Sequence, residues 1–205
     1  MIDNFDLIER LLTFENEDEF YMLQILKRRK ENPEMKGDSK PVKTLYIHRS
    51  GQLTELKEDL VFLARHHNAR IYINLNVKSF RKCTCHCLAE MAKRIANEDF
   101  HKPYKIFDSV AGSAGAARDT RWIIDVDWPE IIFESHLEPL KRQRYIKDMS
   151  EFLKGIQPVG DKVIAVVPTK NGVHVVTKPF NSNDFSKVYT DDSIHKNNPT
   201  LVWCE

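Results

Sequence analysis

The sequence predicts an α/β protein of the α+β type, in which helices flank a central mixed sheet. Helical segments alternate with short apolar strands, and two late strands are separated by a hairpin signal. The chain has 205 residues, of which 41% are hydrophobic, and this is enough for a sizeable core. We expect a helical N-terminal region over residues 1–40 and one main domain over residues 41–205.

Composition and charge limit the function classes. Lys and Arg number 31 and Asp and Glu number 30, so a nucleic-acid contact needs a local patch rather than the charge of the whole chain. No run approaches the roughly 18 apolar residues of a membrane span, and acids stand where a secretory signal has basic residues. Cys83, Cys85 and Cys87 lack the second ligand pair of a structural zinc site. We expect a cytoplasmic protein without membrane contact.

The first 77 residues are expected to hold helices, then a strand, a helix and a strand. Apolar residues spaced by three and four predict helix over most of the first thirty residues. Prolines and a glycine in residues 32–41 interrupt this pattern. A strand is predicted at residues 42–48, a helix at 53–67 and another strand at 69–77.

The rest of the chain is expected to alternate helices and strands. A helix over residues 79–98 leads through a long connection to an apolar strand at 121–128. An amphipathic helix follows at 137–154, then strands at 162–168 and 172–179 around an Asn-Gly hairpin signal. A short helix at 183–189 and a strand at 200–204 complete the predicted order.

Asp125 and Asp127 are the strongest candidates for chemistry. Residues i and i+2 of a strand point to the same side, so the two carboxylates are expected side by side. A cation relieves their mutual repulsion, and carboxylate oxygens favour Mg²⁺ or Mn²⁺. The alternative is a solvated strand end that happens to carry two acids. The apolar residues that precede Asp125 favour the metal site.

His174 follows the predicted hairpin turn within an otherwise apolar strand. Lys170 and Asn171 lie in the turn, so a basic, a polar and a titratable group are expected to gather at the mouth of the strand. The alternative for His174 is a packed, hydrogen-bonded residue without a catalytic role.

The two motifs together resemble the archaeo-eukaryotic primase superfamily, which includes primase-polymerases. The resemblance covers residues 121–180, with Asp125 and Asp127 matching its D-x-D strand and His174 matching its histidine motif. It implies that the acids bind divalent metal and that the histidine contacts the phosphates of the incoming nucleotide. The third acid of the family has a candidate in Glu205, at the end of the last strand, and Asp191 and Asp192 are poorer positional matches.

The resemblance implies a primase-like catalytic core in the main domain. The activity would be that of a metal-dependent nucleotidyltransferase, adding nucleotides from nucleoside triphosphates to a nucleic-acid strand on a single-stranded DNA or RNA template. The short chain favours a role in replication of a phage or other mobile element, by analogy. The alternatives are a nucleic-acid-binding protein with a degenerate site, and a metal-dependent nuclease.

Two further segments are candidates for substrate contacts. Arg70 begins a strand on which polar residues alternate, which is typical of a face that donates hydrogen bonds to phosphate or base, or of a half-exposed strand. Arg142 and Arg144 lie on the helix after the D-x-D strand, where they are expected to contact a nucleic-acid backbone. A solvated charged helix face is the alternative for these two arginines.

Overall fold

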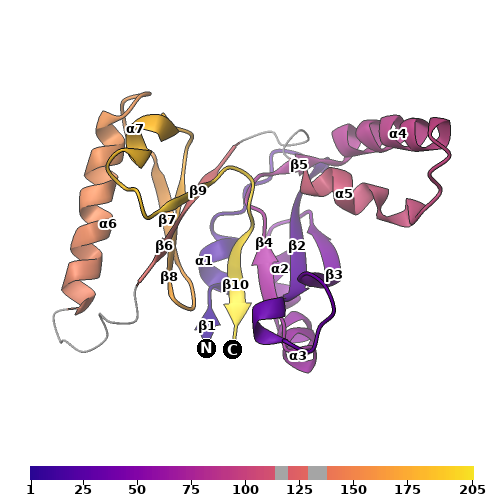
Figure 1. Ribbon diagram of the computed structural model, residues 1–205, viewed down its shortest axis with the longest axis horizontal. Coiled ribbons are helices and arrows are strands. Elements are labelled where there is room, and N and C mark those ends of the chain that lie inside the picture. Colours follow the sequence, from indigo (N-terminus) through magenta and orange to yellow (C-terminus); the bar gives the residue numbers. More distant parts are fainter. Residues whose placement is uncertain (114–119, 129–137) are drawn as a thin grey trace. The chain divides into compact units, whose positions relative to one another are not determined.

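The computed structural model describes residues 1–113, 120–128 and 138–205. The chain divides into two compact units (Figure 1). Unit 1 comprises Met1–Asp119 and Pro199–Glu205, and unit 2 comprises Thr120–Asn198. The α+β class is confirmed, but the single central mixed sheet is wrong, because each unit has its own sheet and every strand pair in the described residues is antiparallel. No described helix has the length and apolar character needed to cross a membrane.

Unit 1 is built on a six-stranded sheet in the order β1, β10, β4, β2, β3, with β5 paired to β2. Its strands are β1 (Ile2–Asp3), β2 (Glu19–Lys27), β3 (Lys40–Ile47), β4 (Arg70–Ile73), β5 (Lys78–Ser79) and β10 (Thr200–Cys204). Its helices are α1 (Phe5–Glu9), α2 (Gln52–Glu55), α3 (Lys57–His66), α4 (Phe80–Ala96) and α5 (Ile106–Gly112), with 3-10 turns at Arg29–Glu31 and Pro103–Lys105.

The helical N-terminal region is wrong for its longest segment. Residues 19–27 form β2, which lies between β3 and β4 in the sheet. Phe20 and Met22 pack with Cys83 of α4 in one apolar cluster, whereas Leu23 and Ile25 are buried on the opposite side of the strand. A strand buried on both faces has a continuous apolar run, and such a run also matches the spacing of a helix. The expected boundary at residue 40 therefore falls inside unit 1.

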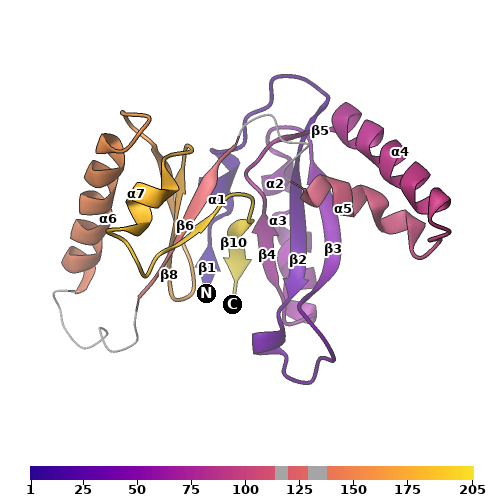
Figure 2. The same cartoon turned by 45° about the horizontal axis from the view of Figure 1, so that its top comes forward.

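Unit 2 has the element order of a split β-α-β fold. Its elements are β6 (Trp122–Asp127), α6 (Glu138–Gly155), β7 (Val163–Pro168), β8 (Gly172–Thr177), α7 (Ser182–Ser186) and β9 (Ser193–His195). The sheet order β7, β8, β6, β9 places β8 between the two strands that flank α6 in sequence, as in ferredoxin-like domains. Figures 1 and 2 show α6 and α7 on the same side of this sheet.

The apolar core of unit 2 lies between the sheet and these two helices. Ile124 and Val126 of β6 pack there with Met149 and Leu153 of α6 and with Phe185 of α7. Because side chains alternate along a strand, Asp125 and Asp127 point to the opposite face of the sheet from α6 and α7. This alternation determines where the candidate acids lie.

Candidate functional site

Asp125 and Asp127 lie on the face of the unit 2 sheet that α6 and α7, the helices described in this unit, do not cover, and we call it the helix-free face. They alternate with Ile124 and Val126, whose side chains are in the core under α6. Asp125 is half-buried and Asp127, at the end of β6, is exposed. The expected placement of both carboxylates on one side of the strand is what the structure has.

His174 lies directly opposite Asp125 on the neighbouring strand. β8 runs antiparallel to β6, and the register pairs Asp125 with His174 and Asp127 with Gly172. Residues directly opposite in an antiparallel pair share a face. His174 Nε2 is 3.4 Å from Asp125 Oδ1, and the side chains are 14% and 33% exposed. The two sequence motifs therefore meet in the fold.

Gly172 allows this close pairing of β6 and β8. A Cβ atom at residue 172 would lie 1.8 Å from the carbonyl oxygen of Val126, which no side chain can occupy. Asn171 O accepts a hydrogen bond from Trp128 N at 2.9 Å, so the contact between the strands continues into the turn. The hairpin is confirmed. Glycine is required at residue 172 by the close approach of the Val126 backbone. It is not required by a left-handed turn, since φ at Gly172 is not positive.

Asp192, a poorer positional match for the third acid than Glu205, lies in unit 2. It immediately precedes β9, a strand missing from the predicted order, whose first residue, Ser193, pairs with Asp125. Burial raises the pKa of Asp192, the hydrogen bond that it accepts from Tyr145 opposes this, and the charges of Asp191 and Asp125 raise it further. The Tyr145 hydroxyl lies 2.6 Å from Asp192 Oδ2. Because Ser193 shares the face of Asp125, the preceding residue, Asp192, points toward α6, where Tyr145 lies, and not toward the face that carries Asp125.

Glu205, the predicted third acid, lies in unit 1. It follows β10, a strand of the other sheet, and its carboxylate forms an ion pair with Arg65 at 3.6 Å. The sheet that carries Asp125 does not include Glu205.

The donor set fits a divalent ion that is completed by water and phosphate. Among the described residues, no group of three or more His, Cys, Asp or Glu side chains is placed to hold a metal ion. Mg²⁺ in nucleotide-dependent sites is held by one or two carboxylates, and substrate phosphates and water supply the other ligands. Asp125 and Asp127, on one face of one strand, match this requirement, and the chemistry of their oxygens suits Mg²⁺ or Mn²⁺.

Lys170 and Asn171 line a cavity on the other side of the sheet. The cavity has a volume of about 550 Å³ and lies within unit 2, between α6 and the β7–β8 turn. Val166, Val173 and Ile146 form apolar walls, and none of the residues known to line it is acidic. Asp125, Asp127 and His174 are not among the residues known to line this cavity, so Lys170 and Asn171 contact a different side of the sheet from His174.

Arg142 and Arg144 differ in their surroundings, although both lie on α6. Arg142 is half-buried, lines the cavity and stacks over the Trp128 ring, with its guanidinium carbon 5.5 Å from the ring centroid. Arg144 is 84% exposed and lies 3.7 Å from Asp148 on the same helix. Arg144 is therefore accessible on the surface of α6, whereas Arg142 forms part of the wall of the cavity.

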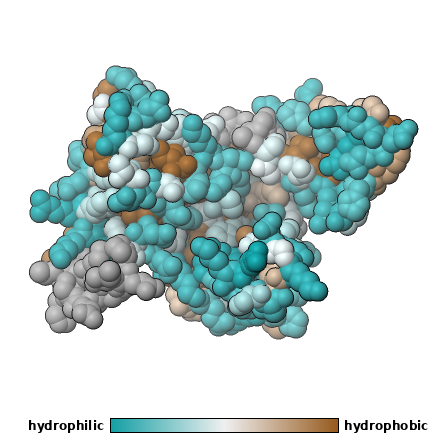
Figure 3. Space-filling model, in the orientation of Figure 1, coloured by the Kyte–Doolittle hydropathy of each residue, from teal (hydrophilic) through white to brown (hydrophobic). Residues whose placement is uncertain are grey.

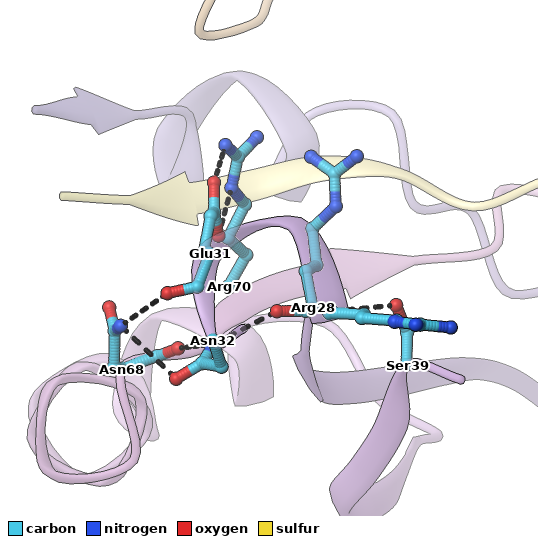
Figure 4. A network of polar contacts seen from close by, with 7 residues as sticks. Arg28, Glu31, Asn32, Ser39, Asn68 and Arg70 are labelled. Carbon is cyan, nitrogen blue, oxygen red and sulfur yellow. Dashed lines mark hydrogen bonds and ion pairs between the residues drawn. The ribbon is translucent and has the colours of Figure 1, made fainter. Parts of the chain in front are cut away.

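Arg70, a predicted nucleotide contact, is part of a polar network in unit 1 (Figure 4). Its guanidinium forms two hydrogen bonds with the carboxylate of Glu31, and its side chain is 11% exposed. Asn68 Nδ2 donates to Glu31 O at 3.2 Å and to Asn32 Oδ1 at 3.1 Å, which ties the turn after β2 to the start of β4. The described contacts of Arg70 are structural.

Comparison with known proteins gives no relative for this chain. A scan of protein-family models and searches of curated proteins and of solved structures found no match.

Proposed function

We propose that unit 2 carries a metal-dependent nucleotidyltransferase centre of the primase-polymerase kind. One observation supports this most directly: Asp125 lies opposite His174 on adjacent antiparallel strands, so the two motifs that resemble the primase superfamily share one face. The proposed reaction uses a nucleoside triphosphate and extends a strand on a single-stranded template.

The proposed roles follow from position and charge. Asp125 and Asp127 would hold Mg²⁺ or Mn²⁺, which when bound neutralises the charge on the transferring phosphate. His174 would donate a hydrogen bond to a phosphate oxygen beside them. The 3′ hydroxyl of the growing strand attacks the α-phosphate in line, and pyrophosphate leaves.

Lys170 adds a cation near the strand end. Gly172 pairs with Asp127 on the neighbouring strand, and Lys170 precedes Gly172 by two residues in the turn. Lys170 therefore lies near the end of β6 that carries Asp127. Lysine is a common phosphate ligand because its ammonium is a compact charge. Its nearness to the acidic end of β6 supports a role in holding the nucleotide, although Lys170 also lines the cavity on the opposite side of the sheet.

The chemistry of the helix-free face favours catalysis over simple strand binding. RNA-recognition domains with the same strand order stack bases on aromatic side chains of their two central strands. None of the described residues of β6 and β8 on that face is aromatic; they are Ile123, Asp125, Asp127, Gly172, His174 and Val176. Paired acids repel a nucleic-acid backbone unless a cation lies between them.

Synthesis on a single-stranded template separates the proposal from its alternatives. With labelled nucleotides and Mn²⁺, the proposal expects products longer than the primer or new short strands, and their loss in Asp125→Ala. Shorter products would instead assign a nuclease, and binding without any product would assign a nucleic-acid-binding protein.

Metal binding is tested without activity. Calorimetry with Mn²⁺ should show at least tenfold weaker binding in Asp127→Asn, because one of two hard oxygen ligands loses its charge. Asp148→Asn, on the exposed side of α6, is the matched control and should bind as the parent does. Equal affinity in Asp127→Asn and the parent would exclude the proposed metal site.

A further inference from the structure

Basic residues gather at the hairpin that joins β2 to β3 of unit 1. Residues 27–43 contain seven Lys and Arg and three Asp and Glu, so this segment has a net charge of +4 at pH 7. The whole chain has a net charge of +1, which makes the rest of the chain negative. We call residues 27–43 the basic hairpin. Figure 3 shows a largely hydrophilic surface, in teal, where this hairpin lies in Figure 1.

The fold brings cations from both sides of the hairpin together. Lys27 of β2 lies directly opposite Lys40 of β3 in the register of the two strands. Arg29 N donates to Ser39 Oγ at 3.2 Å, and this hydrogen bond holds the turn after β2 beside the start of β3. Cations that are distant in sequence therefore form one charged surface.

The acids of the basic hairpin neutralise few of these charges. Glu31 pairs with Arg70 of β4, outside the hairpin, and Glu34 pairs with Lys27 at 3.2 Å, which leaves Asp38 as the third acid. Figure 4 shows the guanidinium of Arg28 pointing the same way as that of Arg70, without an ion pair of its own. Within the described part of the chain, no ion pair includes the other six cations of the hairpin, which are Arg28, Arg29, Lys30, Lys36, Lys40 and Lys43.

Stability of the fold alone does not explain this arrangement. Like charges directly opposite on neighbouring strands are destabilising, as at Lys27 and Lys40. Lysines on an edge strand discourage pairing with other sheets, which accounts for Lys40 and Lys43, because β3 is an edge of the described sheet. It does not account for residues 28–30, all of them basic, which lie in the turn and not on a sheet edge. An anionic partner accounts for both groups.

We infer that the basic hairpin binds the phosphate backbone of a nucleic-acid strand. Lys and Arg bind phosphate oxygens through charge-assisted hydrogen bonds, and Arg does so with two N–H groups at once. Binding in a membrane surface uses apolar side chains as well as cations, and none of the exposed large apolar side chains lies in residues 27–43. The inference goes beyond the proposed function, because it concerns a surface of unit 1 and holds whichever reaction unit 2 performs.

The salt dependence of binding tests the hairpin. The probes are fluorescein-labelled oligothymidylate and a labelled DNA duplex, measured by anisotropy with the full chain. The triple variant Lys36→Gln, Lys40→Gln and Lys43→Gln should reduce the slope of log affinity against log salt by about 2 for the single strand, since each lost phosphate contact removes about 0.7. For the duplex, with about 0.9 for each contact, the expected reduction is about 2.7. The two probes thus distinguish a single strand from a duplex as the source of the backbone.

A matched control removes equal charge from another surface of unit 1. Lys93→Gln, Lys102→Gln and Lys105→Gln replace three exposed lysines on α4 and in the connection after it, and should leave both slopes unchanged. The affinity for Mn²⁺ should be the same in both triple variants and in the parent, so failure of this inference is distinct from failure of the proposed metal site.

Three outcomes would overturn the inference. One is a hairpin variant whose slopes equal those of the parent with both probes, and another is an equal reduction in the hairpin and control variants. Vesicles that contain phosphatidylserine test the other class of anionic partner. If the hairpin variant lost vesicle binding and kept the parent's DNA binding, the surface would be assigned to a membrane instead.

Discussion

The two sheets of the molecule are both antiparallel, but their central strands differ in what they carry. On β2 of unit 1, Met22 packs on one face and Leu23 is buried on the other, so the strand is apolar on both sides. On β6 of unit 2, Ile124 lies in the core under α6, whereas Asp125 occupies the helix-free face.

This difference separates structural from functional polar groups. Burying a carboxylate costs free energy unless a partner or a cation compensates it. Asp125 is half-buried in the middle of a sheet, beside His174 and within the electrostatic reach of Asp192. Packing alone gains nothing from acids at this place, so their position favours a role in binding. Arg70 of unit 1, by contrast, has contacts with Glu31 that hold the fold together.

The largest expected effect comes from Gly172, which sets the distance between the two strands of the candidate site. Gly172→Ala should lower the free energy of unfolding by at least about 3 kcal/mol, because backbone rather than a flexible side chain blocks the new Cβ atom. Urea denaturation measures this change. Gly155→Ala, at the end of α6 with nothing within 4 Å of a Cβ, should be neutral or slightly stabilising. Equal stability of both variants would contradict the close approach.

Local patterns predicted most elements of unit 2 from the sequence. An apolar run that leads into two alternating aspartates predicted β6, and the common face of the acids followed from the alternation of side chains along a strand. The hairpin signal predicted β7 and β8, and a clear amphipathic pattern predicted α6. Strand β9 was missed because three residues, Ser193–His195, are too few to show a period. Without β9, nothing in the sequence places Asp192 near Asp125.

The sequence was a poorer guide to unit 1. Strand β2 is apolar at six of its nine positions, including four in succession from Phe20 to Leu23. Such a run has no alternation to distinguish it from helix, because both faces of the strand are buried. The role of Arg70 could not be predicted either, since its partner, Glu31, lies 39 residues earlier in the chain. Contacts between distant residues of this kind leave no local pattern.

Arg70 tests whether a buried polar group of unit 1 has a structural role only. Arg70→Ala should destabilise the protein by about 2 kcal/mol, because it leaves the carboxylate of Glu31 partly buried without its cation. It should leave the affinity for nucleoside triphosphate unchanged in calorimetry. Arg70→Ala with Glu31→Gln should recover part of the stability. A tenfold loss of nucleotide affinity in Arg70→Ala would instead show that Arg70 contributes to nucleotide binding.

A smaller effect is expected from Asp192 and depends on pH. Burial and the nearby acids raise its pKa, so the folded protein holds this proton more tightly than the unfolded chain does. Its stabilising contribution is complete below the unfolded pKa of about 3.9 and is lost as pH rises through the folded pKa. Asp192→Asn keeps an acceptor for Tyr145 but does not titrate. Relative to the parent, this variant should gain stability between pH 3 and pH 7, measured by urea denaturation with a chelator present. A difference that stays constant with pH would contradict the raised pKa.

The smallest expected effect concerns Arg144. It tests whether the nucleic-acid contact proposed for unit 2 includes α6 as well as the sheet. Arg144 is exposed and bound only loosely to Asp148. Arg144→Gln should therefore leave stability unchanged and reduce the slope of log affinity for single-stranded DNA against log salt by about 0.7, the value for one lost phosphate contact. Lys154→Gln, at the other end of the same helix and paired with Glu151, should leave the slope unchanged. Equal slopes for Arg144→Gln and the parent would assign Arg144 to the solvated face of α6, and the candidate site would then be confined to the sheet and the β7–β8 turn.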